Sequence, residues 1–209
     1  MRNEKELFES DEIRQTETFL LFEKKKKIVT FVPLSHAERL IKVLSSSGAG
    51  QIGNYDMCSF RSNGTGTFRP NKKANPFSGK KNVMASEEEF RLEMECCDDS
   101  INKVIDNLLQ YHPYEEVAYE IYEFVKREKK SSGVIYRLKR SIPLSKILTR
   151  INKEMILENA VNNVDINSIA MTGKKLTAQV KDSAIFSGCD LVVRKLLKPK
   201  KIELLITQL

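Results

Sequence analysis

Residues 28–48 read IVTFVPLSHAERLIKVLSSSG, and this stretch decides the fold of the middle of the chain. β-branched and aromatic residues fill positions 28–32, and Pro33 cannot continue a strand, so a strand is predicted to end there. Apolar residues then recur at helical intervals up to Leu44, and Ser35 stands at capping-box spacing from Glu38. The stretch predicts a strand followed by a helix that ends at Gly48.

The residues that follow extend this pattern. Segment 51–68 predicts two extended pieces around the turn Ser62-Asn63-Gly64, because Asn-Gly is a strong hairpin signal. Segment 71–83 shows no sustained period and is predicted to be a long polar excursion. Segment 90–96 alternates apolar and charged residues as a strand does, 98–109 has a capped apolar helical stripe, and 117–125 is a β-rich run. The order β-α-β(β)-β-α-β over 28–125 predicts an α+β, ferredoxin-like sandwich with one antiparallel sheet and two helices on one face.

The sequence predicts that the chain has three parts. Residues 1–26 are expected to form a polar leader with a helical patch around 13–22, and 27–126 the sandwich domain. Residues 126–132 are charged and lead into Ser131-Ser132-Gly133, which predicts a domain boundary. Residues 133–209 predict a small, incomplete α/β domain, with helices at 143–157 and 176–186, a turn at 162–165, and strands at 166–171, 191–193 and 202–206.

Composition limits the class of protein. The chain has 209 residues, 41% of them hydrophobic, which suits a globular protein. No run approaches the roughly 18 apolar residues of a membrane-spanning helix, and acidic residues crowd the N-terminus, where a secretory signal would be basic and then apolar. Four cysteines without C-x-x-C spacing indicate reduced thiols, so we expect a cytoplasmic location and no membrane partner.

Charge is unevenly distributed along the chain. Residues 126–209 contain 18 Lys or Arg and 7 Asp or Glu, against 17 and 21 in the first 125 residues. This asymmetry admits an anionic partner such as nucleic acid. No aromatic or RNP-like motif interleaves the basic residues, so we expect a solvated lysine-rich surface and no nucleic-acid partner.

Two clusters are candidate ligand-binding sites. Five of the nine glycines fall within nineteen residues, beside an Asn-Tyr pair, a threonine and an arginine: Gly48, Gly50, Gly53, Asn54, Tyr55, Gly64, Thr65, Gly66 and Arg69. Their backbone amides suit an anion-binding nest with the arginine as a charged clamp, although tight turns alone need the same glycines. The second cluster is His112, Glu115 and Glu116, which suits metal ligation or acid–base chemistry, or alternatively a helix-ending His-Pro turn with exposed carboxylates.

Several runs of the chain carry a family resemblance. FVPLSHAE (31–38), GAGQIGNYDMCSF (48–60), GTGTFRP (64–70), NPF (75–77) and HPYEEVAY (112–119) closely resemble the inserted domain of the NIF-three-like family, also called dinuclear-metal-centre proteins or GTP cyclohydrolase type 2 homologues. The resemblance implies a PII/CutA-like, trimer-forming domain. Residues 133–209 resemble the C-terminal part of that family's main domain.

The departures from the family concern its metal site. The family carries a pair of divalent metals, whereas this sequence has only two histidines, His36 and His112, and lacks the closing His and Glu ligands of the family. Lys174-Lys175 replaces a small Gly-Ser-rich turn. We therefore expect no cofactor in this chain, and a degenerate paralogue or one half of a split protein.

These observations predict a non-catalytic ligand-binding or oligomerisation module. The expected partners are further copies of the chain, as a trimer by resemblance, and an anionic small molecule. The alternative is that the chain is one part of a dinuclear-metal hydrolase that another chain completes. In that case the chain would be enzymatic only in the complex.

Overall fold

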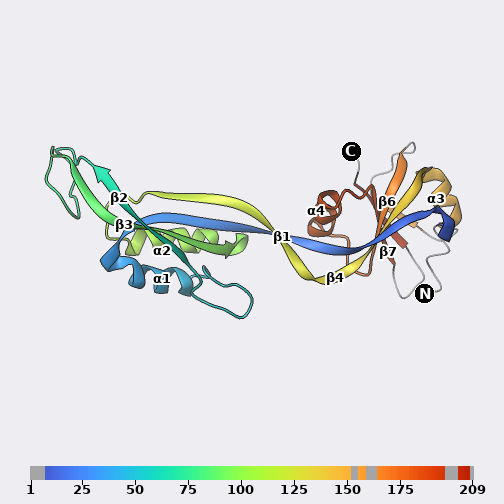
Figure 1. Ribbon diagram of the computed structural model, residues 1–209, viewed down its shortest axis with the longest axis horizontal. Helices are drawn as coiled ribbons and strands as arrows, with labels where there is room; N and C mark the ends of the chain where they lie inside the picture. The colour runs from blue at the N-terminus through green and yellow to red at the C-terminus, as the bar shows by residue number, and fades with distance from the viewer. Residues whose placement is uncertain (1–7, 152–154, 159–163, 196–201, 208–209) are drawn as a thin grey trace. The chain divides into compact units, whose positions relative to one another are not determined.

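The computed structural model describes residues 8–151, 155–158, 164–195 and 202–207 (Figure 1). The chain divides into two compact units. Residues Lys24–Val125 form one, here the inserted unit, and Met1–Glu23 with Lys126–Leu209 form the other, here the two-segment unit. The two strands β1 (Ile13–Pro33) and β4 (Tyr119–Pro143) each have residues in both units.

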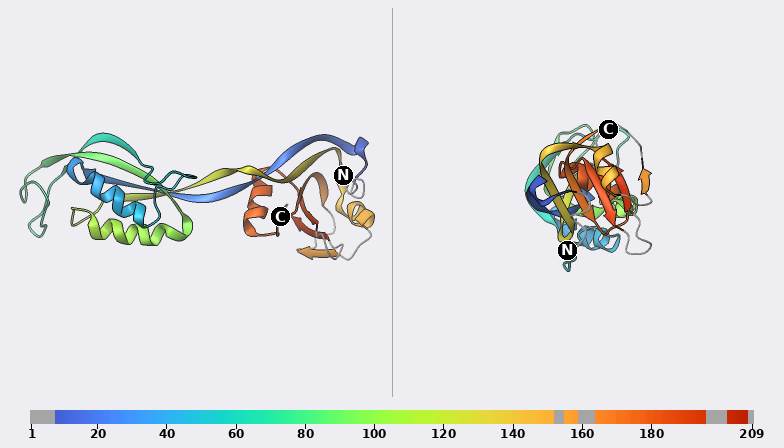
Figure 2. Two further views of the ribbon diagram at one scale, coloured as in Figure 1. Left: turned by 90° about the horizontal axis from the view of Figure 1, so that it is seen from below. Right: turned by 90° about the vertical axis from the view of Figure 1, so that its right-hand side faces the viewer.

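The inserted unit is a four-stranded sheet with two helices. After β1 come α1 (Ala37–Ser46), β2 (Phe60–Phe68), β3 (Ala85–Cys97) and α2 (Ile101–Tyr111), and then the first residues of β4. The spatial order of the strands is β2-β3-β1-β4, and β3 pairs antiparallel with both β1 and β2. Both helices cover the same face of the sheet (Figure 2, left). The predicted α+β class is confirmed.

Alternating apolar residues explain why the helices cover this face. Ile28 of β1 lies opposite Met94 of β3, and both side chains are buried, whereas Glu93 and Glu95 point to the other face. The apolar stripes of α1 and α2 complete the core, whose buried residues are Ile28, Val32, Ala37, Leu40, Ile41, Leu44, Ala49, Leu92, Met94, Cys96, Val104 and Leu108.

Two local predictions in this unit are wrong. Ser62-Asn63-Gly64 is not a turn, because β2 runs straight through it, with Asn63 opposite Phe90 and Gly64 opposite Glu89. Nine consecutive pairings with β3 outweigh the turn preference of Asn-Gly. The capping box is also absent: Ser35 lies in a 3₁₀ turn, Leu34–His36, and α1 begins after His36 without a side-chain cap.

The two-segment unit contains a mixed sheet. Its further elements are α3 (Leu144–Ile151), β5 (Met155–Glu158), β6 (Asp165–Thr172), α4 (Ala178–Phe186), β7 (Leu191–Lys195) and β8 (Ile202–Ile206). The strand order is β1-β4-β6-β7-β8-β5, with β6–β7 and β5–β8 parallel and β4–β6 and β7–β8 antiparallel. The predicted strands at 166–171, 191–193 and 202–206 and the predicted helix at 176–186 are confirmed, apart from their ends.

Each face of this second sheet carries a buried apolar cluster. Ile169 and Leu191 belong to one apolar cluster, while their chain neighbours Ala170 and Val192 belong to another. Because successive side chains of a strand point to opposite faces, the two clusters lie on opposite sides of the sheet. Continuous apolar runs such as Leu191-Val192-Val193 are typical of strands buried in this way.

Two predictions about the flanking segments are wrong. Residues 13–26 are not a leader with a helical patch but part of β1, in which alternate residues Phe19 and Leu21 are buried. The predicted domain boundary at 126–132 lies beside the division between the two units, which falls between Val125 and Lys126, and these residues belong to β4. The helix expected at 143–157 ends at Ile151, and 155–158 is a strand. The turn expected at 162–165 lies partly outside the described residues.

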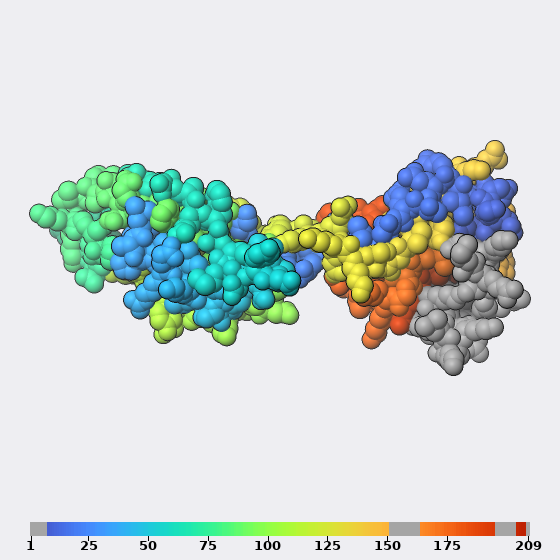
Figure 3. All heavy atoms as spheres, turned by 60° about the horizontal axis from the view of Figure 1, so that its bottom comes forward, coloured from blue at the N-terminus to red at the C-terminus, as the bar shows by residue number. Residues whose placement is uncertain are grey.

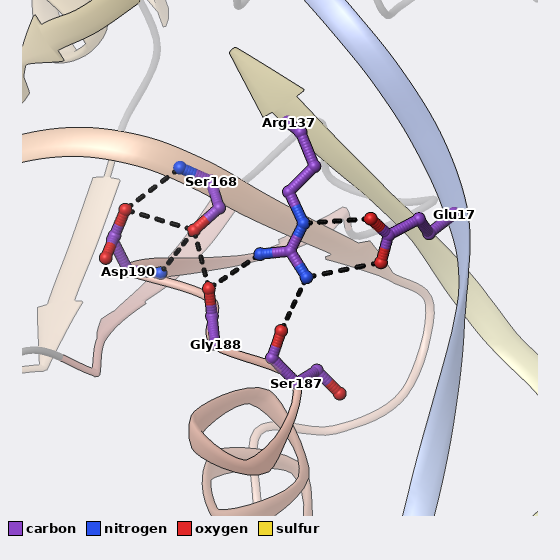
Figure 4. Close-up of polar contacts among 6 residues, drawn as sticks. All are labelled: Glu17, Arg137, Ser168, Ser187, Gly188 and Asp190. Atoms are coloured by element: carbon purple, nitrogen blue, oxygen red, sulfur yellow. Dashed lines mark hydrogen bonds and ion pairs between the residues drawn. The ribbon is translucent and has the colours of Figure 1, made fainter.

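Arg137 of β4 is the centre of a polar network in the two-segment unit (Figure 4). Its guanidinium donates to both carboxylate oxygens of Glu17 on β1, at 3.1 and 3.2 Å. It also donates to the carbonyl oxygens of Ser187 (2.6 Å) and Gly188 (2.7 Å), in the turn between α4 and β7. One side chain thus ties two strands to the end of a helix.

Asp190 organises the same turn from the other side (Figure 4). Its Oδ2 accepts hydrogen bonds from the backbone amides of Asn167 (2.7 Å) and Ser168 (2.9 Å) and from the Ser168 hydroxyl (3.0 Å). Because Ser168 lies on β6 and Asp190 directly precedes β7, these bonds support the parallel β6–β7 pair.

Across the described ranges, no helix is both long and apolar enough to cross a membrane. All four cysteines are free thiols. Cys96 is buried and its neighbour Cys97 is exposed, as predicted for adjacent residues of a strand.

Candidate functional site

The inserted unit contains a cavity of about 710 Å³ beside β2. Residues 62–71 line one side of it without interruption, and β1, β3, the loop 74–78 and the segment 114–118 supply the rest. Its walls include Phe31, Phe68 and Phe77, and charged side chains lie among these rings. The size and the mixture of aromatic and polar walls are typical of small-molecule sites.

Glu89 and Tyr114 form the most buried polar pair of this cavity. Glu89 of β3 is only 9% exposed, and its Oε1 accepts a hydrogen bond from the Tyr114 hydroxyl at 2.6 Å. Burial, with the adjacent carboxylate, raises the pKa of the Tyr114 phenol, so the tyrosine stays a protonated donor. Gly66 makes room for the carboxylate, because a Cβ on this residue would clash with Oε2 of Glu89.

Two arginines line the cavity. Arg91 of β3 donates through Nε to Glu93 at 3.1 Å. Arg69, directly after β2, is exposed, and its side chain forms no hydrogen bond or ion pair with the part of the chain that the structure describes. Arg69 is therefore the cavity cation that is available to an anionic ligand.

The loop after β2 is held against the 112–116 turn. The Phe77 ring packs between His36 (5.2 Å between centroids) and Tyr114 (5.7 Å). The backbone amide of Asn75 donates to both carboxylate oxygens of Glu115, at 2.8 and 2.9 Å. These contacts place the loop as a wall of the cavity, and they give Glu115 a structural partner.

His112 supports the cavity without lining it. It is 7% exposed, its Nδ1 accepts from the backbone amide of Tyr114 (3.2 Å), and its Nε2 lies 3.1 Å from the carbonyl oxygen of Phe31. Since Nδ1 accepts, Nε2 carries the proton and donates, which describes a neutral imidazole with both nitrogens in use. Burial lowers the pKa of His112, in agreement with this neutral form.

The cavity unites only part of the predicted site. Gly64, Thr65, Gly66, Arg69, Glu115 and Glu116 line it, whereas Gly48, Gly50, Gly53, Asn54 and Tyr55 do not. Gly64 and Gly66 lie in a regular strand without positive φ, so the amide nest expected there is not formed.

In the loop after α1, Gly50 is needed for close packing. Gly50 has φ +74°, donates to the carbonyl of Glu95 and accepts from the amide of Cys58, at 2.7 and 2.8 Å. A Cβ on it would lie 2.7 Å from the Cys58 carbonyl oxygen. The amides of Gly48, Ala49 and Ile52 are likewise bonded within the loop or to α1, so the nest expected at 48–53 is also not formed. This loop (cyan) is part of the surface shown in Figure 3.

Sequence reasoning missed Glu89, Tyr114 and Phe77. Glu89 belongs to a run of charged residues at the start of β3, and only its register opposite Gly64 marks it as different from its neighbours. Among the residues that the structure describes, no group of three or more His, Cys, Asp or Glu side chains is placed to hold a metal ion.

Comparison with known proteins identifies relatives of this chain. No family model matches it. The GTP cyclohydrolase 1 type 2 homolog of Halalkalibacterium halodurans is 34% identical over 163 residues, which are 78% of this chain and 41% of that protein. The protein of the same name from Bacillus subtilis is 32% identical over 164 residues, again 78% of this chain and 41% of that protein.

The chain belongs to the NIF-three-like family. It spans about two-fifths of the length of these curated family members. A solved Bacillus cereus protein related to NIF3 is 27% identical, with a TM-score of 0.47, and the match covers 96% of this chain and 57% of that protein. The divalent cation tolerance protein CutA from Archaeoglobus fulgidus matches 47% of this chain at 17% identity and a TM-score of 0.34.

Proposed function

We propose that the inserted unit is a ferredoxin-like, PII/CutA-like module that binds a small anionic molecule in the cavity and does not itself catalyse a reaction. One observation carries the proposal: a cavity of about 710 Å³ with aromatic walls and an arginine, Arg69, whose charge the described part of the chain leaves unpaired. A guanidinium at the rim attracts phosphate or carboxylate groups, and the rings accommodate a planar body.

The order β-α-β-β-α-β and the strand order β2-β3-β1-β4 support the ferredoxin-like assignment. His112 has both ring nitrogens engaged, which favours a positioning role over metal ligation or proton transfer. The four free thiols favour a cytoplasmic location.

Isothermal titration of the full chain with nucleoside monophosphates and with pyrophosphate tests the proposal. We expect Arg69→Gln to weaken binding by about tenfold or more, because it removes a charge-assisted hydrogen bond to the anion. The control is Arg39→Gln, which removes an exposed arginine of α1 that does not line the cavity. Equal affinities of the two variants, or no binding of any of these anions to the wild type, would refute the proposal.

We also propose that the inserted unit associates with further copies of the chain, as a trimer. Large apolar side chains of this unit are exposed in the described structure, notably Tyr55 (75%), Phe60 (63%) and Met84 (65%). Large exposed apolar side chains supply area that a contact between copies would bury. Light scattering coupled to gel filtration measures the assembly, and Phe60→Ser should shift it toward the monomer. A wild type that remains monomeric at high concentration would contradict this.

A second candidate function is participation in a dinuclear-metal hydrolase that another chain completes. The name of the relatives, GTP cyclohydrolase 1 type 2 homolog, favours it. Metal analysis of the purified chain, alone and with a partner that carries the missing ligands, decides the matter. Near-stoichiometric metal in the mixture would support this function, and its absence from both samples would exclude it.

A further inference from the structure

We infer that Glu89 is the specificity-determining residue of the cavity, and that it selects ligands that present adjacent N–H donors, the edge that a guanine base carries. The inference rests on the proposed function, since it concerns the ligand of the same cavity. It assigns recognition of the base to Glu89 and recognition of the anionic group to Arg69.

Glu89 is almost completely buried, with 9% of its surface exposed. A buried carboxylate is unfavourable unless hydrogen bonds or a cation compensate for the lost hydration. Within the described ranges, its one hydrogen-bond partner is the Tyr114 hydroxyl, which occupies one site on Oε1. A carboxylate has about four acceptor sites, so most of its capacity remains for a ligand.

Gly66 places this carboxylate. Oε2 of Glu89 lies where a Cβ of residue 66 would be, so any side chain at residue 66 would displace the carboxylate. Tyr114 holds the other oxygen. Both oxygens are therefore positioned before a ligand arrives, which is the arrangement expected of a recognition group rather than of a solvated surface acid.

The surroundings narrow the class of ligand. Phe31, Phe68 and Phe77 offer flat apolar surfaces against which a planar ring can stack. Arg69 lines the same cavity and suits a phosphate. A ligand that joins a planar donor edge to an anion meets all three features, and purine nucleotides have this composition.

Chemistry then distinguishes the purines. Guanine presents the N1–H and the 2-amino group side by side, so both can donate to one carboxylate. Hypoxanthine presents only the N1–H. Adenine places the lone pair of N1 on this edge, which the carboxylate repels. The expected order of affinity is therefore GMP, then IMP, then AMP, with GMP favoured over AMP by about tenfold or more.

Titration of the full chain with these three nucleotides tests the inference, because they share the same ribose and phosphate. Glu89→Gln should bring the affinities for GMP and AMP to within about threefold of each other, because the amide keeps the size of the side chain but loses one acceptor. The control is Glu87→Gln, which removes the same charge two residues earlier on β3, at a residue that does not itself line the cavity. This variant should keep the preference for GMP.

Gly66→Ala is a second variant that leaves the charge in place. Its methyl group would displace the Glu89 carboxylate, so it should also abolish the preference for GMP while AMP binding persists. Far-UV circular dichroism establishes that each variant is folded. If Glu89→Gln fails to fold, the GMP preference of Gly66→Ala tests the role of Glu89 instead.

The outcomes separate the two proposals. Equal binding of GMP and AMP by the wild type, or a preference for GMP that survives both substitutions, would overturn the role of Glu89 while the anion-binding function stands. Failure of the wild type to bind any nucleotide or pyrophosphate would overturn both.

Discussion

Replacement of Arg137 by methionine should destabilise the two-segment unit by about 3 kcal/mol. Methionine keeps an apolar stem of similar length and removes the guanidinium, so the change isolates the polar contacts of the head group. Four hydrogen bonds disappear: two to Glu17 and one each to the carbonyl oxygens of Ser187 and Gly188.

The magnitude follows from the exposure of each contact. The Glu17 side chain is 36% exposed and that of Arg137 20%, so the ion pair is partly screened and contributes about 1 kcal/mol. Each hydrogen bond from the charged group to a carbonyl contributes about 1 kcal/mol or somewhat more. Glu17→Gln removes the ion pair and leaves the carbonyl bonds, so it should cost only about 1 kcal/mol.

Urea unfolding of the full chain at pH 7, followed by far-UV circular dichroism, measures both variants. The control is Arg140→Met, an exposed arginine further along β4, which should change the free energy of unfolding by less than about 0.5 kcal/mol. Equal losses for Arg137→Met and Glu17→Gln would refute the reasoning, because they would mean that the two carbonyl bonds contribute nothing.

The same pair predicts a dependence on pH. The hydrogen bond from Arg137 lowers the pKa of the Glu17 carboxyl below its ordinary value of 4.5. A lowered pKa means that the contribution of the pair is complete above pH 4.5 and is lost as the pH falls and the folded carboxyl is protonated. The difference between wild type and Glu17→Gln should therefore shrink below pH 4.5, and a constant difference would contradict this cause.

Three further substitutions test other parts of the structure. Gly50→Ala should destabilise the protein by at least about 2 kcal/mol, because the new methyl group would meet the Cys58 carbonyl oxygen in a backbone with positive φ. Gly53→Ala also has positive φ but has nothing within 4 Å of the new methyl group, so it should cost only about 1 kcal/mol. Urea unfolding compares the two variants, and equal losses would contradict a role for the contact with Cys58. A hydrogen bond from Arg150 lowers the pKa of the Glu12 carboxyl to about 2, so this carboxylate stabilises the fold at pH 7 and its contribution is lost as the pH falls from 4.5 to 2. Glu12→Gln should therefore lower the free energy of unfolding at pH 7 but not at pH 2. An unchanged midpoint of acid unfolding in this variant would refute this. Burial lowers the pKa of His112, so the wild type should lose stability as the pH falls below 6.5, because the unfolded chain takes up the proton more readily. His112→Gln cannot take up this proton and should lack that loss. A variant whose stability depends on pH between 7 and 5 as the wild type's does would refute this cause.

Local patterns predicted the elements whose burial has a simple period. Segment 90–96 alternates apolar and charged residues because one face of β3 packs against helices, and the apolar stripe of 101–109 arises because α2 packs against the same sheet. Residues 191–193 and 202–206 are predicted as strands from their apolar runs, and the structure buries 191–193 and 204–206 on both faces of the sheet. These signals lie within a few residues of each other, so a single sequence is enough to detect them.

Predictions failed where distant pairing outweighs local preference. Asn63-Gly64 has the composition of a turn, yet both residues pair with β3 in the middle of a strand. Residues 13–26 have the polarity of a terminal leader, but they belong to the long strand β1, whose partners lie far away in the sequence. Composition cannot reveal a partner that is a hundred residues away.

The sequence marked some residues of the candidate site, and only the tertiary structure identified the others. Its glycines and Arg69 are marked in the sequence by their density and by their spacing, because glycine is needed wherever a neighbouring group approaches the main chain. Only the tertiary structure decided which glycines serve the cavity and which serve a packed loop, and only the register of β2 on β3 placed Glu89 over Gly66 and within reach of Tyr114. A binding site consists of residues from separate segments that lie close together in space, and here they come together only when the strands pair.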